Sequence, residues 1–303
     1  MARFCGAPLM YVRCASPHRY ERFMIRIRSH RFKSMVVRRG VMALLGCGLL
    51  AVSACDRAGK GEWRSAADAN PTAGEASEAG YVAPPSVDAV ARTAGGLTLR
   101  GTGAPGATVR LGAPTGEALL GRVDAQGRWT LTAPASDGVR LYGLSMTKAE
   151  RTVQAEGYVL VTPEGGLALL RAGAGAFVMG VESISPRILA VDVDPQGGAV
   201  ISGVGSPGAG LGARVDRTPR AVGQADDTGR FFLSLSEPLA MGGHDIQVSG
   251  EGGEQKIALA VSPAAPLTEG PVRATRLDNG WRIDWITPGG GIQTSYLLHG
   301  SAR

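Results

Sequence analysis

Leu99-Arg-Gly101-Thr-Gly103-Ala-Pro105-Gly106-Ala107 occurs a second time in this chain, in altered form, as Ile201-Ser-Gly203-Val-Gly205-Ser-Pro207-Gly208-Ala209. The offset between the two stretches is 102 residues. Another pair has the same offset, because Asp124-Ala-Gln-Gly127-Arg128-Trp129 matches Asp226-Asp-Thr-Gly229-Arg230-Phe231. Two separate blocks with one common offset indicate a duplicated structural unit.

Each copy has the pattern of short β-strands separated by turns. Apolar and polar residues alternate around Trp129 and Leu131, and again around Phe231 and Leu233. The Pro-Gly pairs favour type II turns, since proline presets the first central φ and glycine adopts the positive φ of the second. The Asp-x-x-Gly blocks favour hairpin loops in which the aspartate caps the turn. Strands with this spacing predict all-β sandwiches.

A further match predicts an extra β-hairpin after each sandwich. Val161-Thr162-Pro163-Glu-Gly-Gly166-Leu167 is similar to Ile286-Thr287-Pro288-Gly-Gly-Gly291-Ile292, at an offset of 125 residues. We therefore expect two tandem sandwiches with hairpins, the first at 96–185 and the second at 186–303. The early strands of the second copy depart from the strand pattern, because Gly210-Leu211-Gly212-Ala213 stands where a clean strand is expected.

The repeated blocks resemble bacterial immunoglobulin-like domains of surface and envelope proteins. Those repeats often read Gly-Thr-x-x-Pro-Gly-Ala-x-Val followed by Asp-x-x-Gly-x-Trp, which Gly101–Val109 and Asp124–Trp129 match, and the second copy fits with Phe231 in the Trp place. The resemblance covers most of 95–262. It implies a seven-strand type of sandwich and an adhesive, spacer or binding role, and it specifies no ligand.

The N-terminal segment, 1–54, has the features of an export signal. It contains ten Lys or Arg residues and one acid, and Arg38-Arg39 leads directly into the apolar run 41–54. This run of 14 residues is shorter than the about 20 residues that a membrane-spanning helix needs. The start of a normal signal helix is open between Met1, Met24 and Met35.

Val52-Ser53-Ala54-Cys55 resembles the lipobox of bacterial lipoproteins. The resemblance implies cleavage between Ala54 and Cys55 and acylation of Cys55, including palmitate, so that the lipid bilayer is a partner. It also implies a membrane-anchored protein on the periplasmic side. In enteric bacteria an Asp at the position of Asp56 resembles the signal for retention in the inner membrane, while the outer membrane stays open. Residues 55–95 are small and polar, and we expect a disordered linker there.

Charge and glycine motifs argue against nucleic acid and nucleotide partners. The whole chain has a formal charge of +6, but the residues after Ala54 sum to −3, which lacks the excess that phosphate neutralisation needs. Gly101-x-Gly103-x-x-Gly106 and Gly203-x-Gly205-x-x-Gly208 match the dinucleotide fingerprint. In both copies, however, a strand pattern follows the glycines where that fingerprint requires a helix.

No set of residues predicts catalysis, a cofactor or a thiolate or histidine metal site. Cys55 is the only cysteine expected in the mature chain, and His244 and His299 have no metal-ligand spacing. His244 and Asp245 should point to opposite faces of a strand, so they form no catalytic pair. A calcium site near one end of the second sandwich stays open, because acidic residues gather there, namely Asp192, Asp194, Asp226 and Asp227.

Two function classes follow. The first is a structural, adhesive or protein-interaction role in the bacterial envelope, without enzymatic activity. The alternative is a glycan-binding module, with peptidoglycan as the partner, in which Trp281 and Trp285 stack on sugar rings. Trp281-Arg282-Ile283-Asp284-Trp285 alternates, so both rings and Ile283 should share one face, which either is exposed or closes the edge of the second sandwich.

Overall fold

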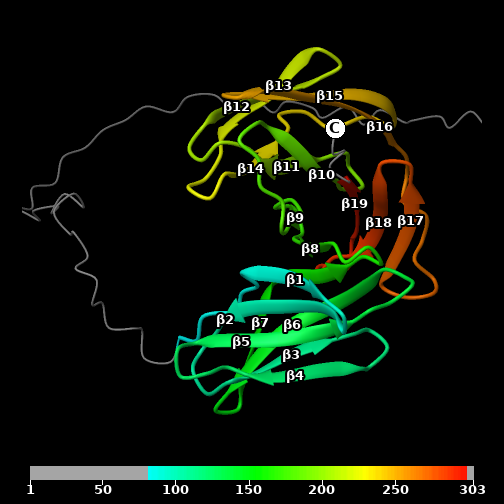
Figure 1. Cartoon of the computed structure of the whole chain (residues 1–303). Coiled ribbons are helices and arrows are strands. Elements are labelled where there is room, and N and C mark those ends of the chain that lie inside the picture. Colours follow the sequence, from blue (N-terminus) through cyan, green and yellow to red (C-terminus); the bar gives the residue numbers. More distant parts are fainter. Residues whose placement is uncertain (1–80, 299–303) are drawn as a thin grey trace, which may run out of the picture. The chain divides into compact units, whose positions relative to one another are not determined.

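The computed structural model describes residues 81–298. The predicted signal helix, Cys55, His299 and the first part of the predicted linker therefore lie outside the described residues. Within the described range the chain is all-β, with nineteen strands in four antiparallel sheets and no helix (Figure 1). The prediction of two tandem immunoglobulin-like sandwiches with extra hairpins is confirmed for this part of the chain.

The first sandwich consists of a three-stranded and a six-stranded sheet. The smaller sheet has the order β1 (Ala89–Thr93), β2 (Gly96–Thr102) and β5 (Arg128–Pro134). The larger sheet has the order β4 (Ala118–Arg122), β3 (Thr108–Gly112), β6 (Arg140–Lys148), β7 (Arg151–Val161), β8 (Leu167–Leu170) and β9 (Phe177–Val178). Alternating residues of both sheets point inward and form one core, with Leu99, Leu111, Trp129 and Met146 fully buried.

The second sandwich consists of a six-stranded and a four-stranded sheet. The first has the order β14 (Arg230–Ser234), β11 (Ala199–Val204), β10 (Arg187–Val193), β19 (Ile292–Leu298), β18 (Gly280–Ile286) and β17 (Val272–Leu277). The second has the order β13 (Thr218–Gln224), β12 (Gly210–Val215), β15 (Gly242–Gly250) and β16 (Gly253–Val261). Strand β12 forms despite its glycines, because Leu211, Ala213 and Val215 all point into the core.

The predicted turns are confirmed in both copies. Gly106 has a φ of 78°, and the N–H of Ala107 donates to the carbonyl of Ala104 at 3.1 Å, as a Pro-Gly type II turn requires. The carboxylate of Asp124 accepts hydrogen bonds from the N–H groups of Gln126 and Arg128, at 2.9 and 2.8 Å. The second copy repeats both arrangements, around Gly208 and Asp226.

The two extra hairpins form at the predicted Thr-Pro-x-Gly-Gly turns, but they extend different sheets. In the first copy the turn joins β7 to β8, which lengthens the larger sheet. In the second copy the turn joins β18 to β19, and β19 pairs with β10. The sheet of β10 and β11 corresponds to the smaller sheet of the first sandwich. Equivalent sequence motifs therefore add strands on opposite layers of the two sandwiches.

The predicted linker 55–95 is too long at its C-terminal end. Strand β1 lies inside this range, and Val87 is buried in the first core. The N–H of Ser86 donates to the carbonyl of Thr102 at 3.1 Å, so pairing with β2 begins before Ala89. No clear sequence pattern marks this strand, because most residues of β1 are exposed and only one face of the segment contributes to the core.

Candidate functional site

A third hydrophobic cluster joins the two sandwiches. The first sandwich contributes Leu141, Leu160, Ala168, Leu170 and Ala176, and the second contributes Ala190, Ile283, Trp285 and Leu297. Trp285 is fully buried, and its ring meets Tyr158 edge-on with the ring centroids 5.8 Å apart. The C-terminal end of β7, residues 159–161, and strand β8 place one face in this cluster and the other in the first core, so both faces are buried there. The junction is a shared core.

Of the two alternatives for the tryptophan face, the exposed row does not hold for Trp285, which is fully buried. Trp281, Ile283 and Trp285 do share one face of β18, but this face packs into the junction cluster and does not simply close the edge of the second sandwich. Trp281 is half-buried, and its indole N–H donates to Glu164 at 3.2 Å. The guanidinium of Arg276 lies 4.9 Å from the centroid of the Trp281 ring. Trp285 is therefore inaccessible to a sugar ring, and Arg276 already covers one face of Trp281.

Glu164, in the turn between β7 and β8, connects this turn to the second sandwich. It forms an ion pair with Arg276 and accepts the hydrogen bond from Trp281. Partial burial acts to raise the pKa of Glu164, but hydrogen bonds from its own backbone, Arg276, Thr162 and Trp281 lower it overall. The carboxylate thus stays ionised and ties the first extra hairpin to β17 and β18.

The loop between β8 and β9 is held by buried polar groups of the second sandwich. The N–H of Ala176 donates to Asp192 at 2.6 Å, and the carbonyl of Ala176 accepts from the Ser202 hydroxyl at 2.6 Å. The N–H of Gly173 donates to the Gln293 side chain at 3.0 Å. Because all of these partners lie on the sheet of β10, β11 and β19, the loop docks on a surface already formed by the second copy.

Asp192 is the centre of this buried network. Its carboxylate accepts hydrogen bonds from Ser295, from Gln293 at 3.2 Å and from Ala176, while the indole N–H of Trp285 donates to Ser295 at 3.0 Å. Burial raises the pKa of Asp192, and these donors act against that rise. All three neighbours donate, which suits an ionised carboxylate. Asp192 therefore stabilises the junction through hydrogen bonds.

Two arginine–phenylalanine pairs cross the junction in opposite directions. The guanidinium of Arg171, after β8, lies 4.4 Å from the ring centroid of Phe232 in β14. The guanidinium of Arg230 in β14 lies 4.0 Å from the ring centroid of Phe177 in β9. Cation–π contacts of this kind contribute about 0.5–2 kcal/mol each, depending on burial. All four residues line a cleft of about 780 Å³, whose charged groups include Glu156.

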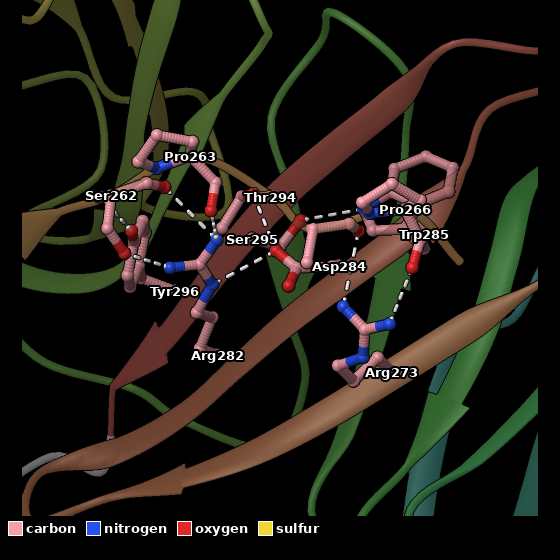
Figure 2. A network of polar contacts seen from close by, with 11 residues as sticks. Ser262, Pro263, Pro266, Arg273, Arg282, Asp284, Trp285, Thr294, Ser295 and Tyr296 are labelled. Atoms are coloured by element: carbon pink, nitrogen blue, oxygen red, sulfur yellow. Dashed lines mark hydrogen bonds and ion pairs between the residues drawn. The ribbon is translucent and has the colours of Figure 1, made fainter. Parts of the chain in front are cut away.

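A second polar network fixes the connector between β16 and β17 (Figure 2). Arg282 forms an ion pair with Asp284 at 3.0 Å and donates to the carbonyls of Ser262 and Pro263, both at 3.1 Å. Thr294 donates to Asp284 at 2.7 Å. Figure 2 also shows Arg273, which holds the connector further along through carbonyls such as that of Pro266. The proline-rich connector is thus pinned to β17 and β18.

The four acidic residues of the possible calcium site do not lie together. Asp192 is buried in the junction, whereas Asp194 accepts hydrogen bonds from the N–H groups of Gln196 and Gly198 at 2.8 Å. Asp226 caps its own hairpin, and Asp227 is exposed beside it. Within residues 81–298, no group of three or more His, Cys, Asp or Glu residues has the geometry to hold a metal ion.

His244 forms a structural contact. Its Nδ1 atom lies 2.7 Å from the Asp216 carboxylate, and its Nε2 atom lies 2.8 Å from the carbonyl of Ala240. Asp245 points elsewhere and pairs with Lys256 at 3.0 Å. The expectation that His244 and Asp245 form no pair agrees with these contacts. Both nitrogens of the ring are already engaged.

Sequence reasoning missed the junction residues Tyr158, Leu160, Leu170 and Asp192. One indication was present, because Tyr158–Val161 and Leu167–Leu170 are apolar at successive positions and do not alternate. Such runs are typical of strands buried on both faces. The polar partners of the loop after β8 carry no such indication, since they lie 16 to 120 positions away in the chain.

Cys55 and the lipobox lie outside the described residues, so the predicted anchor stays a prediction. Between Tyr81 and Leu298, the chain contains no helical segment with the length and apolar character that a membrane crossing demands.

Two of the solved structures that resemble this chain show how weak the similarity is. One is described as "Biofilm associated protein - BSP domain", with 14% identity, a TM-score of 0.21, and coverage of 61% of this chain and 30% of that one. The other is "Central Fibronectin-III array of RIM-binding protein", with 11% identity, a TM-score of 0.23, and coverage of 71% and 88%. This chain thus spans less than a third of the first structure. No family model and no curated protein matches it. At these scores the similarities carry no argument about function.

Proposed function

We propose that this chain is an exported lipoprotein whose two joined sandwiches form a structural or adhesive arm in the bacterial envelope. In this proposal Cys55 is acylated, the chain is held on the periplasmic side of a membrane, and the sandwiches contact a protein partner. The role is non-enzymatic. Asp56 favours the inner membrane.

The single observation that supports the arm is the shared junction core. Tandem domains joined only by a linker move freely unless their interface is large and hydrophobic. Here Trp285 is fully buried between the two sandwiches, and Asp192 and Glu164 add buried or half-buried polar contacts. A module pair of this kind keeps a fixed geometry, which a spacer or adhesive arm requires.

The lipid anchor is supported by the lipobox sequence and by the energetics of acyl chains. Each buried CH₂ group contributes about 0.8 kcal/mol, so two or three chains hold a protein far more firmly than one. The glycan-binding alternative has lost its main support, because Trp285 is buried and Arg276 covers one face of Trp281.

Metabolic labelling with a fatty-acid probe tests the anchor. We expect the wild-type chain to be labelled and to sediment with membranes, and Cys55→Ser to lose the label. Cys47→Ser is the matched control, because Leu44-Leu45-Gly46-Cys47 is the only other short match to a lipobox, and it should keep the label. An unlabelled wild type, or loss of label in Cys47→Ser alone, would contradict the proposal.

Equilibrium unfolding tests the arm. Trp285→Ala should cost about 3–5 kcal/mol, as for other buried aromatic residues, and should separate one unfolding transition into two. Trp281→Ala, at a half-buried position on the same strand, is the control and should keep one transition. If Trp285→Ala leaves the transition single and its midpoint unchanged, the sandwiches are not coupled through this core.

A further inference from the structure

The two copies end in equivalent edge strands that carry large exposed apolar side chains. β4 is the outermost strand of its sheet, and β13 is the outermost strand of the four-stranded sheet. Leu120 in β4 and Val222 in β13 are separated by the repeat offset of 102 residues, and they are 64% and 88% exposed. An unpaired strand edge with an apolar residue is a template for adding another strand.

The edge at β13 is closed by contacts within the second sandwich. The N–H of Ser236 donates to the carbonyl of Arg220 at 2.8 Å, so the outer side of β13 is already hydrogen-bonded at this position. The Arg220 side chain also forms an ion pair with Glu237. Next to them, His244 pairs with Asp216. A further strand cannot align along β13 without breaking the contacts of Arg220 with Ser236 and Glu237.

The edge at β4 lacks the hydrogen bond and the ion pair that Arg220 forms at β13. The residues equivalent to Arg220, Ser236 and Glu237 are Ala118, Pro134 and Ala135. Proline has no N–H, so Pro134 cannot donate to the carbonyl of Ala118. Alanine has no charge, so the Arg220–Glu237 ion pair has no counterpart, and Glu117, the residue before β4, pairs instead with Arg140 of β6 at 3.5 Å. Among residues 81–298, β4 pairs with β3 and with no other strand.

A hollow of about 310 Å³ lies beside this open edge, with Ala118, Pro134 and Tyr142 in its lining. Tyr142 is 3% exposed, yet its hydroxyl has no hydrogen-bond partner within the described range. The Tyr142 hydroxyl lies close enough to Arg140 to raise the pKa of the Arg140 guanidinium, but the two groups lack hydrogen-bond geometry. The first copy is therefore incompletely packed at the place where the second copy is closed.

The backbone of β4 presents donors and acceptors outward. The N–H of Val123 donates to the carbonyl of Ala107, and the carbonyl of Glu117 accepts from Ala113, so residues 117 and 123 bond toward β3. Because this direction alternates along an antiparallel strand, Ala118, Leu120 and Arg122 direct their N–H and C=O groups away from β3.

We propose that β4 pairs antiparallel with β4 of a second copy of this chain, centred on Leu120. In this register Leu120 lies opposite Leu120 of the second copy, and Arg122 lies opposite the small Ala118, next to Glu117. The strand therefore begins beside an acid, Glu117, which pairs with Arg140 in its own copy at 3.5 Å, and it ends on a base. Antiparallel self-pairing places Arg122 of each copy near the end of the strand that carries the acid. A parallel register would align like charges. The two six-stranded sheets then continue into each other.

This pairing gives the proposed arm a partner, namely another copy of itself, and it uses residues of the first sandwich only. It therefore stands whether or not Cys55 is acylated. Failure of fatty-acid labelling would leave it intact, and failure of the experiments below would leave the anchor intact.

Cross-linking of the full chain tests the register. With a short bismaleimide, Leu120→Cys should give a covalent homodimer in at least about tenfold higher yield than Val222→Cys, because Cα atoms of such a strand pair lie about 5.5 Å apart. The wild-type chain controls for its native cysteines. Equal yields at the two positions, no dimer, or cross-linking of Leu120→Cys only to a different protein would overturn the proposal.

Sedimentation of the full chain in detergent gives a second readout without new cysteines. A lysine on an edge strand opposes pairing, so Leu120→Lys should shift the dimer to monomer, whereas Val222→Lys should leave it unchanged. Both residues are exposed, so neither change threatens the core. A wild-type chain that stays monomeric at high concentration, or that dimerises equally as Leu120→Lys, would overturn the proposal.

Discussion

The edge of β4 and the edge of β13 occupy the same position in two copies of one fold, yet only one of them is closed. Their inner sides are alike, because Gly121 and Gly223 approach Leu131 and Leu233 in the same way. Their outer sides differ at a few positions, above all at Pro134 and its equivalent Ser236. A duplicated sandwich can therefore keep its core and change only whether its sheet ends or continues.

Core substitutions should have equal effects in the two copies, and these are the largest effects we expect. Trp129 and Phe231 are equivalent and almost fully buried, and each ring lies against a glycine, Gly101 or Gly203. Trp129→Ala and Phe231→Ala should each cost about 3–5 kcal/mol of unfolding free energy. Denaturant titration measures both. If one substitution lowered the unfolding free energy much less than the other, the two cores would not be equivalent.

Opening the closed edge should have the next largest effect. Ser236→Pro removes the N–H that donates to Arg220 and should cost about 1 kcal/mol, which is typical of one hydrogen bond. In the Val222→Cys chain it should also raise homodimer cross-linking. Ser236→Ala is the matched control, since it keeps the N–H, and it should change neither quantity. An unaltered cross-linking yield in Ser236→Pro would mean that this hydrogen bond does not close the edge.

Closing the edge of β4 should change stability and cross-linking less than Ser236→Pro does, and in the opposite direction. The triple change Ala118→Arg, Pro134→Ser and Ala135→Glu copies the contacts of β13 onto β4. It should add about 0.5–1 kcal/mol of stability and lower the cross-linking of Leu120→Cys. Pro134→Ala separates the two contributions, because it restores the N–H alone. Undiminished cross-linking in the triple variant would show that another feature holds the copies together.

The sequence was sufficient for the parts of the fold that depend on local rules. Pro105-Gly106 and Asp124-x-x-Gly127 mark their turns because only certain residues adopt those backbone angles. Alternation correctly placed Trp281 and Trp285 on one face. What covers that face depends on Tyr158 and Leu160, which lie far away in the chain, and no local pattern contains that information.

The difference between the edges was present in the sequence but could not be interpreted there. Ser236 and Pro134 are related by the repeat offset, and the sequence alone shows that they differ. The meaning of the difference depends on which way the backbone N–H points, and that direction follows only from the pairing of β5 and β14 with their neighbours. Asp192 is a similar case, since an acid in a strand predicts exposure unless its donors are known.

The pH dependence of the closed edge is the smallest effect we expect, because one exposed partner is involved. Partial burial acts to lower the pKa of His244, but hydrogen bonds to Asp216 and to the carbonyl of Ala240 raise it overall above its ordinary 6.5. The hydrogen bond from His244 lowers the pKa of Asp216 below its ordinary 3.8, and the N–H of Asp245 adds to that effect.

The two shifts set the pH window in which this pair stabilises the second sandwich. A histidine with a raised pKa contributes fully below 6.5, and the contribution is lost as pH rises through the raised value. An aspartate with a lowered pKa contributes fully above 3.8, and the contribution is lost as pH falls through the lowered value. Melting temperatures should therefore fall slightly between pH 6 and pH 8, and Asp216→Asn should remove that fall. A fall that persists in Asp216→Asn must come from groups outside this pair, and the His244–Asp216 contact would then not contribute to the pH dependence.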